Sequence, residues 1–99
     1  MAHYVVKARP KGDMPSLKQS LDSGEIARMK PFGKALDFSL NNARQDGDWL
    51  TWEEEDYCVP PLAQERAAVL DRYFADLSVR TVRQGEGWKQ LQGLPRAWK

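Results

Sequence analysis

The Asp46-Gly47 dipeptide constrains the fold of this chain more than any other feature, because it lies between two segments that alternate apolar and polar residues. Segment 36–41 precedes the dipeptide, and a segment from Trp49 to about Tyr57 follows it. Such alternation is typical of half-buried strands. Tight hairpin turns need positive φ angles, which Asp-Gly adopts readily. The sequence therefore predicts a β-hairpin, and with it an antiparallel sheet, in the middle of the chain.

Four further segments have the pattern of a regular element. Ala2–Arg9 alternates like a strand, and the short, β-branched segment Ser78–Arg83 is typical of a last strand. Apolar residues at helical spacing predict helices near Pro15–Gly24 and over Pro61–Leu77. The predicted order of elements is β-α-β-β-α-β.

The length of 99 residues predicts a single domain over residues 1–99. Its last part, from about residue 85 to 99, is an extension that contains Trp88, Leu91, Leu94 and Trp98. This segment is too apolar for a tail exposed to solvent. We expect it to pack on its own domain or on a neighbouring copy.

The fold class predicted by this order is α+β. Two halves that each contain one helix are typical of a ferredoxin-like domain, here with a four-stranded antiparallel sheet and both helices on one face. In length and element order, nearly the whole chain resembles the dimeric α+β barrel superfamily. That resemblance implies that two copies pack through their uncovered sheet faces, which makes the chain itself its partner in a homodimer.

The same superfamily includes small monooxygenases that need no prosthetic group, lactone isomerases and haem-degrading enzymes. The resemblance rests on element order and size, and it brings no catalytic motif with it. The only histidine is His3, so histidine chemistry in the middle or C-terminal half of the fold is not implied. No cofactor is predicted.

Charge and composition exclude several classes of partner and location. Residues 35–78 contain ten acidic and three basic residues, and four consecutive carboxylates, 53–56, fall on the strand that an RNA-binding domain of this topology would use. These carboxylates would repel phosphate, so nucleic-acid binding is rejected. No apolar run approaches the roughly 18 residues of a membrane span. The single cysteine and the lack of a signal-peptide pattern predict a cytoplasmic protein.

Strand alternation groups the candidate site residues on one sheet face. His3 and Val5 share a face of the first strand, and Trp49 and Glu53 share a face of the third. These two strands are adjacent in the ferredoxin-like order. We predict a cleft with Val5 and Trp49 as apolar ligand-binding residues and with His3 and Glu53 as catalytic residues, since imidazole readily transfers protons near neutral pH.

Each candidate also has a simpler structural interpretation. His3 can be an exposed residue at a strand end. Cys58 can be a nucleophile or a small buried filler, and the nearby carboxylates favour the filler. The run from Glu53 to Asp56 can supply an acid–base pair or bind a hard cation, but it lacks a calcium-loop motif and a neighbouring histidine. A solvated acidic rim is the commoner outcome, and no metal is predicted.

The leading functional hypothesis is a small homodimeric domain that binds a small organic molecule over the sheet. It would act either as a simple binding domain or as a minor metabolic or biosynthetic enzyme. The alternative is a non-catalytic accessory or protein-interaction module whose aromatic sheet face is buried in the dimer. An open pocket beside His3, Trp49 and the acidic strand would favour the first hypothesis.

Overall fold

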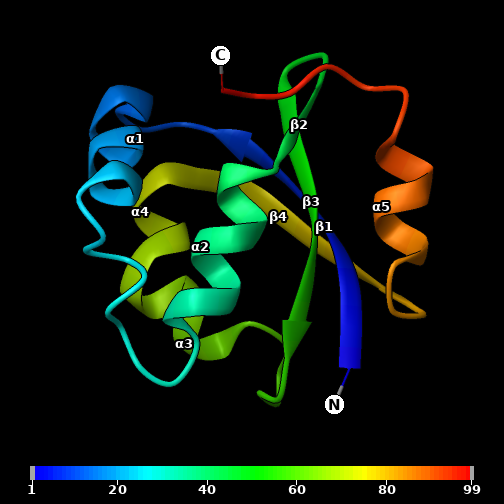
Figure 1. The fold of residues 1–99 in the computed structure, drawn as a ribbon, viewed down its shortest axis with the longest axis horizontal. Helices are drawn as coiled ribbons and strands as arrows, with labels where there is room; N and C mark the ends of the chain where they lie inside the picture. The colour runs from blue at the N-terminus through cyan, green and yellow to red at the C-terminus, as the bar shows by residue number, and fades with distance from the viewer. Residues whose placement is uncertain (1, 99) are drawn as a thin grey trace.

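A computed structural model describes residues 2–98 as an α+β fold built on a four-stranded antiparallel sheet (Figure 1). The strands are β1 (Ala2–Pro10), β2 (Arg44–Asp46), β3 (Trp49–Asp56) and β4 (Phe74–Val82), and their order in the sheet is β2-β3-β1-β4. All three neighbouring pairs are antiparallel. The predicted class and sheet type are therefore confirmed.

Helix α1 (Met14–Asp22) begins where the sequence predicts a helix near residue 15. The side chain of Asp13 accepts the backbone N–H of Ser16 at 3.2 Å, which satisfies one of the free donors at the helix start. The apolar side of the helix carries Leu17 and Leu21, and both are buried. The predicted first helix is thus confirmed, with its end two residues before Gly24.

Segment 36–41 was predicted to be a strand, and this prediction is wrong. The segment is part of helix α2 (Gly33–Asn41). Alternation misled the prediction because Leu36 and Leu40 are also four residues apart, so they lie on one side of a helix and are both buried. Phe38 lies between them in sequence and is 59% exposed. Leu36 and Leu40 therefore fit the spacing of a helix as well as that of a strand, and their burial selects the helix.

The hairpin at Asp46-Gly47 is confirmed. Its turn joins β2 to β3, Asp46 pairs with Trp49, and Gly47 has a φ of 60°. Only the first arm differs from the prediction, because β2 begins at Arg44, after α2 has ended.

The second predicted helix, Pro61–Leu77, is shorter in the structure. It comprises three consecutive pieces, α3 (Ala63–Glu65), the π-helical stretch η1 (Arg66–Leu70) and α4 (Asp71–Tyr73), and β4 starts directly afterwards. The element order is therefore β-α-α-β-β-α-β, followed by a further helix, rather than βαββαβ.

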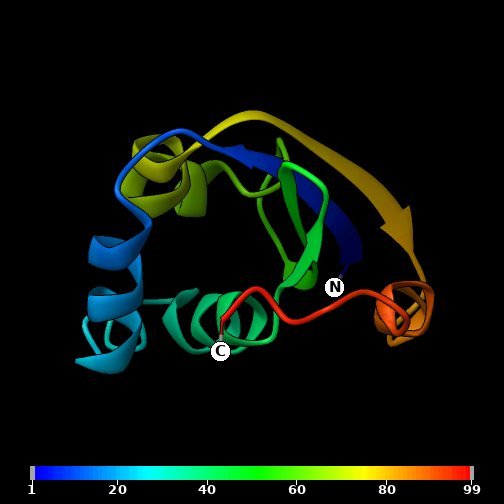
Figure 2. The ribbon, with the colours of Figure 1, turned by 90° about the horizontal axis from the view of Figure 1, so that it is seen from above.

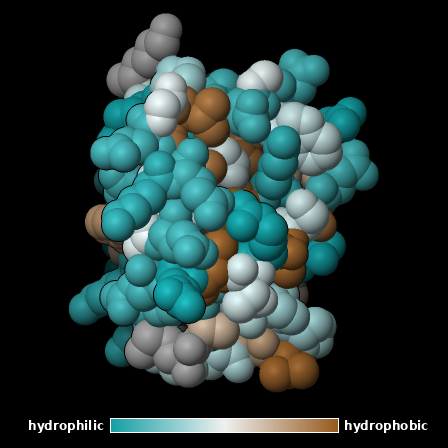
Figure 3. Space-filling model, turned by 90° about the vertical axis from the view of Figure 1, so that its right-hand side faces the viewer, coloured by the Kyte–Doolittle hydropathy of each residue, from teal (hydrophilic) through white to brown (hydrophobic). Residues whose placement is uncertain are grey.

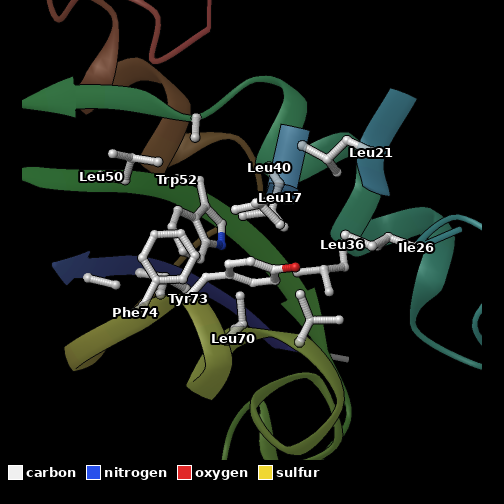
Figure 4. Close-up of a cluster of buried hydrophobic side chains, with 14 of the residues drawn as sticks. Leu17, Leu21, Ile26, Leu36, Leu40, Leu50, Trp52, Leu70, Tyr73 and Phe74 are labelled. Atoms are coloured by element: carbon white, nitrogen blue, oxygen red, sulfur yellow. The ribbon is translucent and has the colours of Figure 1, made fainter. Parts of the chain in front are cut away.

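The main hydrophobic core lies between one face of the sheet and the helices α1, α2 and η1–α4 (Figure 4). Trp52 is fully buried at its centre and its ring packs against Phe74, with ring centroids 5.4 Å apart. The side chains drawn around them come from all three helical segments, namely Leu17, Leu21, Leu36, Leu40, Leu70 and Tyr73.

The other face of the sheet is partly covered by α5 (Glu86–Leu91), the helix that the sequence analysis missed. Figure 2 shows α5 on the opposite side of the strands from α1, and the last segment of the chain running from α5 across to α2. That segment is fixed by hydrogen bonds within the chain: Ala97 N–H donates to Ala43 O at 2.9 Å, and Trp98 Nε1 donates to Leu40 O at 2.7 Å. The extension thus packs on its own subunit.

Seen from the side that carries α5, the surface is mostly hydrophilic, with smaller hydrophobic areas between polar side chains (Figure 3). Within residues 2–98, no helix has both the length and the apolar character needed to cross a bilayer.

Candidate functional site

A hollow of about 330 Å³ lies where β1 and β3 approach α2 and α5. Four segments distant in sequence contribute to its wall, so it exists only in the folded chain. The lining residues are His3, Ala35, Phe38, Ser39, Glu53, Glu55, Gln84, Gly85 and Trp88.

The pairing of β1 with β3 brings His3 and Glu53 to this hollow. His3 lies opposite Glu55, and Val5 lies opposite Glu53, so His3 and Glu53 are diagonal neighbours on one sheet face. His3 Nδ1 is 3.8 Å from Glu53 Oε2, and the two side chains are 12% and 5% exposed. The structure therefore places the two predicted catalytic residues side by side, at a separation longer than a direct hydrogen bond.

Glu53 has a second contact, with the start of α5. Its Oε2 accepts the backbone N–H of Gly85 at 2.8 Å, and its Oε1 accepts the N–H of Trp88 at 3.1 Å. Backbone N–H groups in the first turn of a helix have no partner inside the helix, so a carboxylate from a neighbouring strand satisfies them well. Glu53 thus fixes α5 beside His3.

Two aromatic side chains form the apolar side of the hollow. Phe38 of α2 and Trp88 of α5 pack edge to face, with ring centroids 6.2 Å apart and an interplanar angle of 88°. Helix α2 is also tied to the sheet, because Ser39 Oγ donates to the backbone carbonyl of Glu53 at 2.7 Å. The hollow therefore combines an aromatic edge with polar groups from the strands.

The two predicted ligand-binding residues lie outside the lining of this hollow. Val5 is 8% exposed and lies under α5, close to Gly87. Trp49 begins β3, four residues before Glu53, a separation of roughly 13 Å along a strand. Its ring is covered by Lys7 Nζ at 5.3 Å and Arg9 Cζ at 4.6 Å. Residues of the same chain thus cover the part of the sheet face on which the homodimer prediction rested.

A second polar cluster lies on the opposite face of β3. It contains Glu54, Asp56 and Glu65, which are all buried, together with the half-buried Cys58. Burial holds the pKa of Glu54 well above its usual value, although the hydrogen bond from Trp52 acts to lower it. The pKa of Glu65 is also raised, chiefly by burial and next by a hydrogen bond with Asp56. Burial acts to raise the pKa of Asp56 too, but hydrogen bonds, first from the N–H of Leu62 and then from Glu65, outweigh it and lower that pKa.

The thiol of Cys58 is not activated by this environment. A backbone hydrogen bond with Gln64 acts to lower its pKa, but burial and the neighbouring Asp56 outweigh that bond and raise the pKa. A nucleophilic cysteine needs the reverse. The interpretation of Cys58 as a nucleophile therefore loses its support.

Several residues of the hollow were not anticipated from the sequence. Phe38 was assigned to a strand, while Gln84, Gly85 and Trp88 follow the last strand in a segment with no recognisable motif. The apolar residues of this segment, Trp88 among them, were the signal that it packs against the domain.

Comparisons of the chain with known protein families, with characterised proteins and with solved structures give no match.

Proposed function

We propose that this domain binds a small organic molecule in the hollow beside His3, as a simple binding domain or as a minor enzyme. The observation that carries the proposal is that His3, 3.8 Å from Glu53, lies in the wall of a hollow of about 330 Å³ with an aromatic edge. Small-molecule sites typically combine an apolar lining with a few fixed polar groups, and they start at roughly 300 Å³.

The lining favours a ligand with a flat apolar part and a polar end. The flat part would pack against Phe38 and Trp88, and the polar end would bond to His3 or Glu55. Both oxygens of Glu53 already accept backbone N–H groups, so Glu53 would position α5 and His3 rather than react. If the ligand is turned over, His3 is the group that would carry the proton.

A thermal-shift screen of the full chain against a library of metabolites tests the proposal, since a ligand that binds only the folded state raises the melting temperature. Binding of each hit is then measured by calorimetry on the wild type and on His3→Ala and Phe38→Ala. We expect both variants to weaken binding by at least about tenfold, equivalent to roughly 1.4 kcal/mol. Val59→Ala, which removes an exposed apolar side chain outside the hollow, is the matched control and keeps the wild-type affinity.

Two results would count against the proposal. One is a screen with no hit that raises the melting temperature. The other is a hit whose affinity is the same for the wild type, His3→Ala and Phe38→Ala, which would place its site elsewhere.

At the level of the fold, we infer a ferredoxin-like domain. The support is the sheet order β2-β3-β1-β4 with every pair antiparallel, in which the first and third strands are central. The extra helix α2 precedes β2, and α5 follows β4. A dimeric α+β barrel would pack two sheets through the face that carries α5 here, so α5 would have to lie at the edge of such an interface.

The homodimer stays a prediction, and so does the alternative of a non-catalytic interaction module. Exposed apolar side chains that a partner could cover are Phe38, Tyr57, Val59 and Val79. Light scattering at micromolar concentration should give twice the chain mass of 11.3 kDa. A mass of one chain would contradict the dimer, and a dimer that fills the hollow would favour the interaction module.

A further inference from the structure

The second polar cluster, Glu54, Asp56, Cys58 and Glu65, lies on the face of β3 opposite Glu53. It contains the donor atoms of a candidate metal site. Asp56 ends β3, Cys58 follows two residues later, and Glu65 ends α3. One ligand atom from each of the three lies within 4.8 Å of the others. The loop between strand and helix is closed by the backbone N–H of Leu62, which donates to Asp56 Oδ2 at 2.5 Å and so holds α3 against the end of the strand.

The cluster also contains buried carboxylate oxygens without partners. Glu65 is fully buried, and its Oε2 has no hydrogen-bond donor among residues 2–98. Glu54 is 1% exposed: its Oε1 accepts the indole N–H of Trp52 at 2.8 Å, while its Oε2 has no donor in the same part of the chain. The carboxyl groups of Glu54 and Glu65 lie within hydrogen-bonding reach of each other. Glu54 Oε2 thus belongs to a buried carboxyl group that lies within reach of Glu65 from outside the set of three donors.

No basic side chain compensates these carboxylates within residues 2–98. The ion pairs in this part of the chain involve Glu53, Asp46, Asp76, Asp22 and Asp71, and none of them involves the cluster. Buried carboxylates need either protons or a cation, because an isolated buried charge is very costly. A bound cation would supply the missing positive charge.

The identity of the donors selects the kind of cation. Two carboxylates and one thiolate suit a borderline metal such as Zn²⁺, and do not suit Mg²⁺ or Ca²⁺, which take oxygen ligands. In a tetrahedral zinc site, a sulfur and an oxygen ligand are roughly 3.5 Å apart, given bond lengths of about 2.3 and 2.0 Å. Cys58 Sγ and Glu65 Oε1 are already 3.8 Å apart.

The site has an opening to its surroundings. A hollow of about 130 Å³ is lined by Asp56 and Cys58, along with Phe32, Tyr57 and Gln64. A metal held by three protein ligands would keep a fourth position for water or a ligand group. The hollow reaches Asp56 and Cys58, while Glu65 is fully buried and does not line it.

We propose that Asp56, Cys58 and Glu65 bind one Zn²⁺-type divalent cation, and that Glu54 is a positioning residue behind Glu65. The three donors are not among the residues that line the hollow beside His3, and they make the end of β3, α3 and the loop between them a metal-binding unit.

The test uses the full chain after removal of metals with EDTA. Titration with Zn²⁺ should saturate at one ion per chain by native mass spectrometry and raise the melting temperature. Co²⁺ should give a thiolate-to-metal charge-transfer band that Zn²⁺ abolishes and excess Mg²⁺ does not. Cys58→Ser should remove this band. Glu54→Gln should weaken Zn²⁺ binding by roughly 10–100-fold, the effect that is typical for a residue that only positions a ligand. Glu65→Gln should weaken Zn²⁺ binding by more than this, because it removes a ligand.

Asp48→Asn is the matched control, because it removes an equal charge from an exposed position in the hairpin turn, outside the three donors and outside the hollow that leads to them. It should keep the wild-type affinity and the cobalt band. Circular dichroism of each variant shows whether it is folded. If a carboxylate variant unfolds, Cys58→Ser still tests the site, because its position is only half-buried.

Two outcomes would overturn the proposal. One is the absence of saturable Zn²⁺ or Co²⁺ binding to the wild-type chain, which would leave a cluster of carboxyl groups that share protons. The other is binding that Cys58→Ser and Glu65→Gln leave unchanged, which would mean that the ion is held elsewhere.

Discussion

The carboxylate of Glu53 accepts the backbone N–H of Trp88 at 3.1 Å, although the two residues are 35 positions apart in the chain. This bond, with the one from Gly85, ties α5 to the sheet and closes the hollow beside His3. Glu53→Ala should therefore destabilise the domain by about 1.5–3 kcal/mol, the usual value for hydrogen bonds to a charged group. Urea denaturation measures the loss, and hydrogen exchange should show that α5 loses protection first. Glu55→Ala, on the same strand, should stay within about 0.5 kcal/mol of wild type.

Gly87 lets α5 lie close to β1 and β3. A Cβ at this position would be 2.7 Å from Val5 Cγ2 and 2.8 Å from Glu53 Oε1. Gly87→Ala gains up to about 1 kcal/mol in helix propensity, but overpacking typically costs about 1–3 kcal/mol, so we expect a net loss of stability. Gly93→Ala is the control, because no atom of the described residues 2–98 lies within 4 Å of a Cβ there. A Gly87→Ala protein more stable than wild type would show that α5 is free to move away from the sheet.

Leu70 tests the packing of the η1 segment. Its side chain is fully buried in the core, so Leu70→Ala should lower the free energy of unfolding by roughly 2–5 kcal/mol. Val59→Ala, at a position that is 96% exposed, should change it by less than about 0.5 kcal/mol. Chemical denaturation of both variants makes the comparison. Equal stabilities would contradict the assignment of Leu70 to the core.

The buried Glu54 should make the stability of the metal-free protein depend on pH. Its pKa is raised in the folded state, chiefly by burial, above the ordinary value of 4.5. The folded chain therefore holds a proton that the unfolded chain releases. This contribution to stability is fully present below about pH 4.5 and is lost as the pH rises through the folded-state pKa.

Glu54→Gln keeps an acceptor for the indole of Trp52 and cannot ionise, so it should reduce this loss of stability. Because the pKa of Glu65 is also raised, part of the dependence should remain. Denaturation in EDTA across this pH range measures the slope. The same slope in wild type and Glu54→Gln would show that Glu54 is ionised in the folded chain.

Local patterns predicted the parts of the fold that depend on neighbouring residues. The turn at Gly47 and the start of α1 each depend on residues a few positions away, and both are found where expected. The prediction of a strand over segment 36–41 was wrong because the spacing of its leucines fits both a strand and a helix. Only packing of Leu36 and Leu40 against the core selects the helix.

Strand alternation predicted only the part of the candidate site that lies on the sheet. Alternation put His3 and Glu53 on one face, and the structure puts them at one hollow. It could not indicate that Trp88 would join them, because the contact with Glu53 spans 35 residues. Glu65 was likewise not singled out, although it lies within the predicted helix Pro61–Leu77. Its complete burial follows from the fold of the loop that joins β3 to α3.

The proposed binding hollow is tested most directly by an NMR titration of the ¹⁵N-labelled chain with the tightest hit from the metabolite screen. Binding in the hollow predicts that the largest amide shifts fall on the residues around it, namely His3, Ser39, Gly85 and Trp88, with small shifts at the hairpin turn around Gly47. Shifts concentrated away from the hollow, with these four amides unchanged, would contradict it.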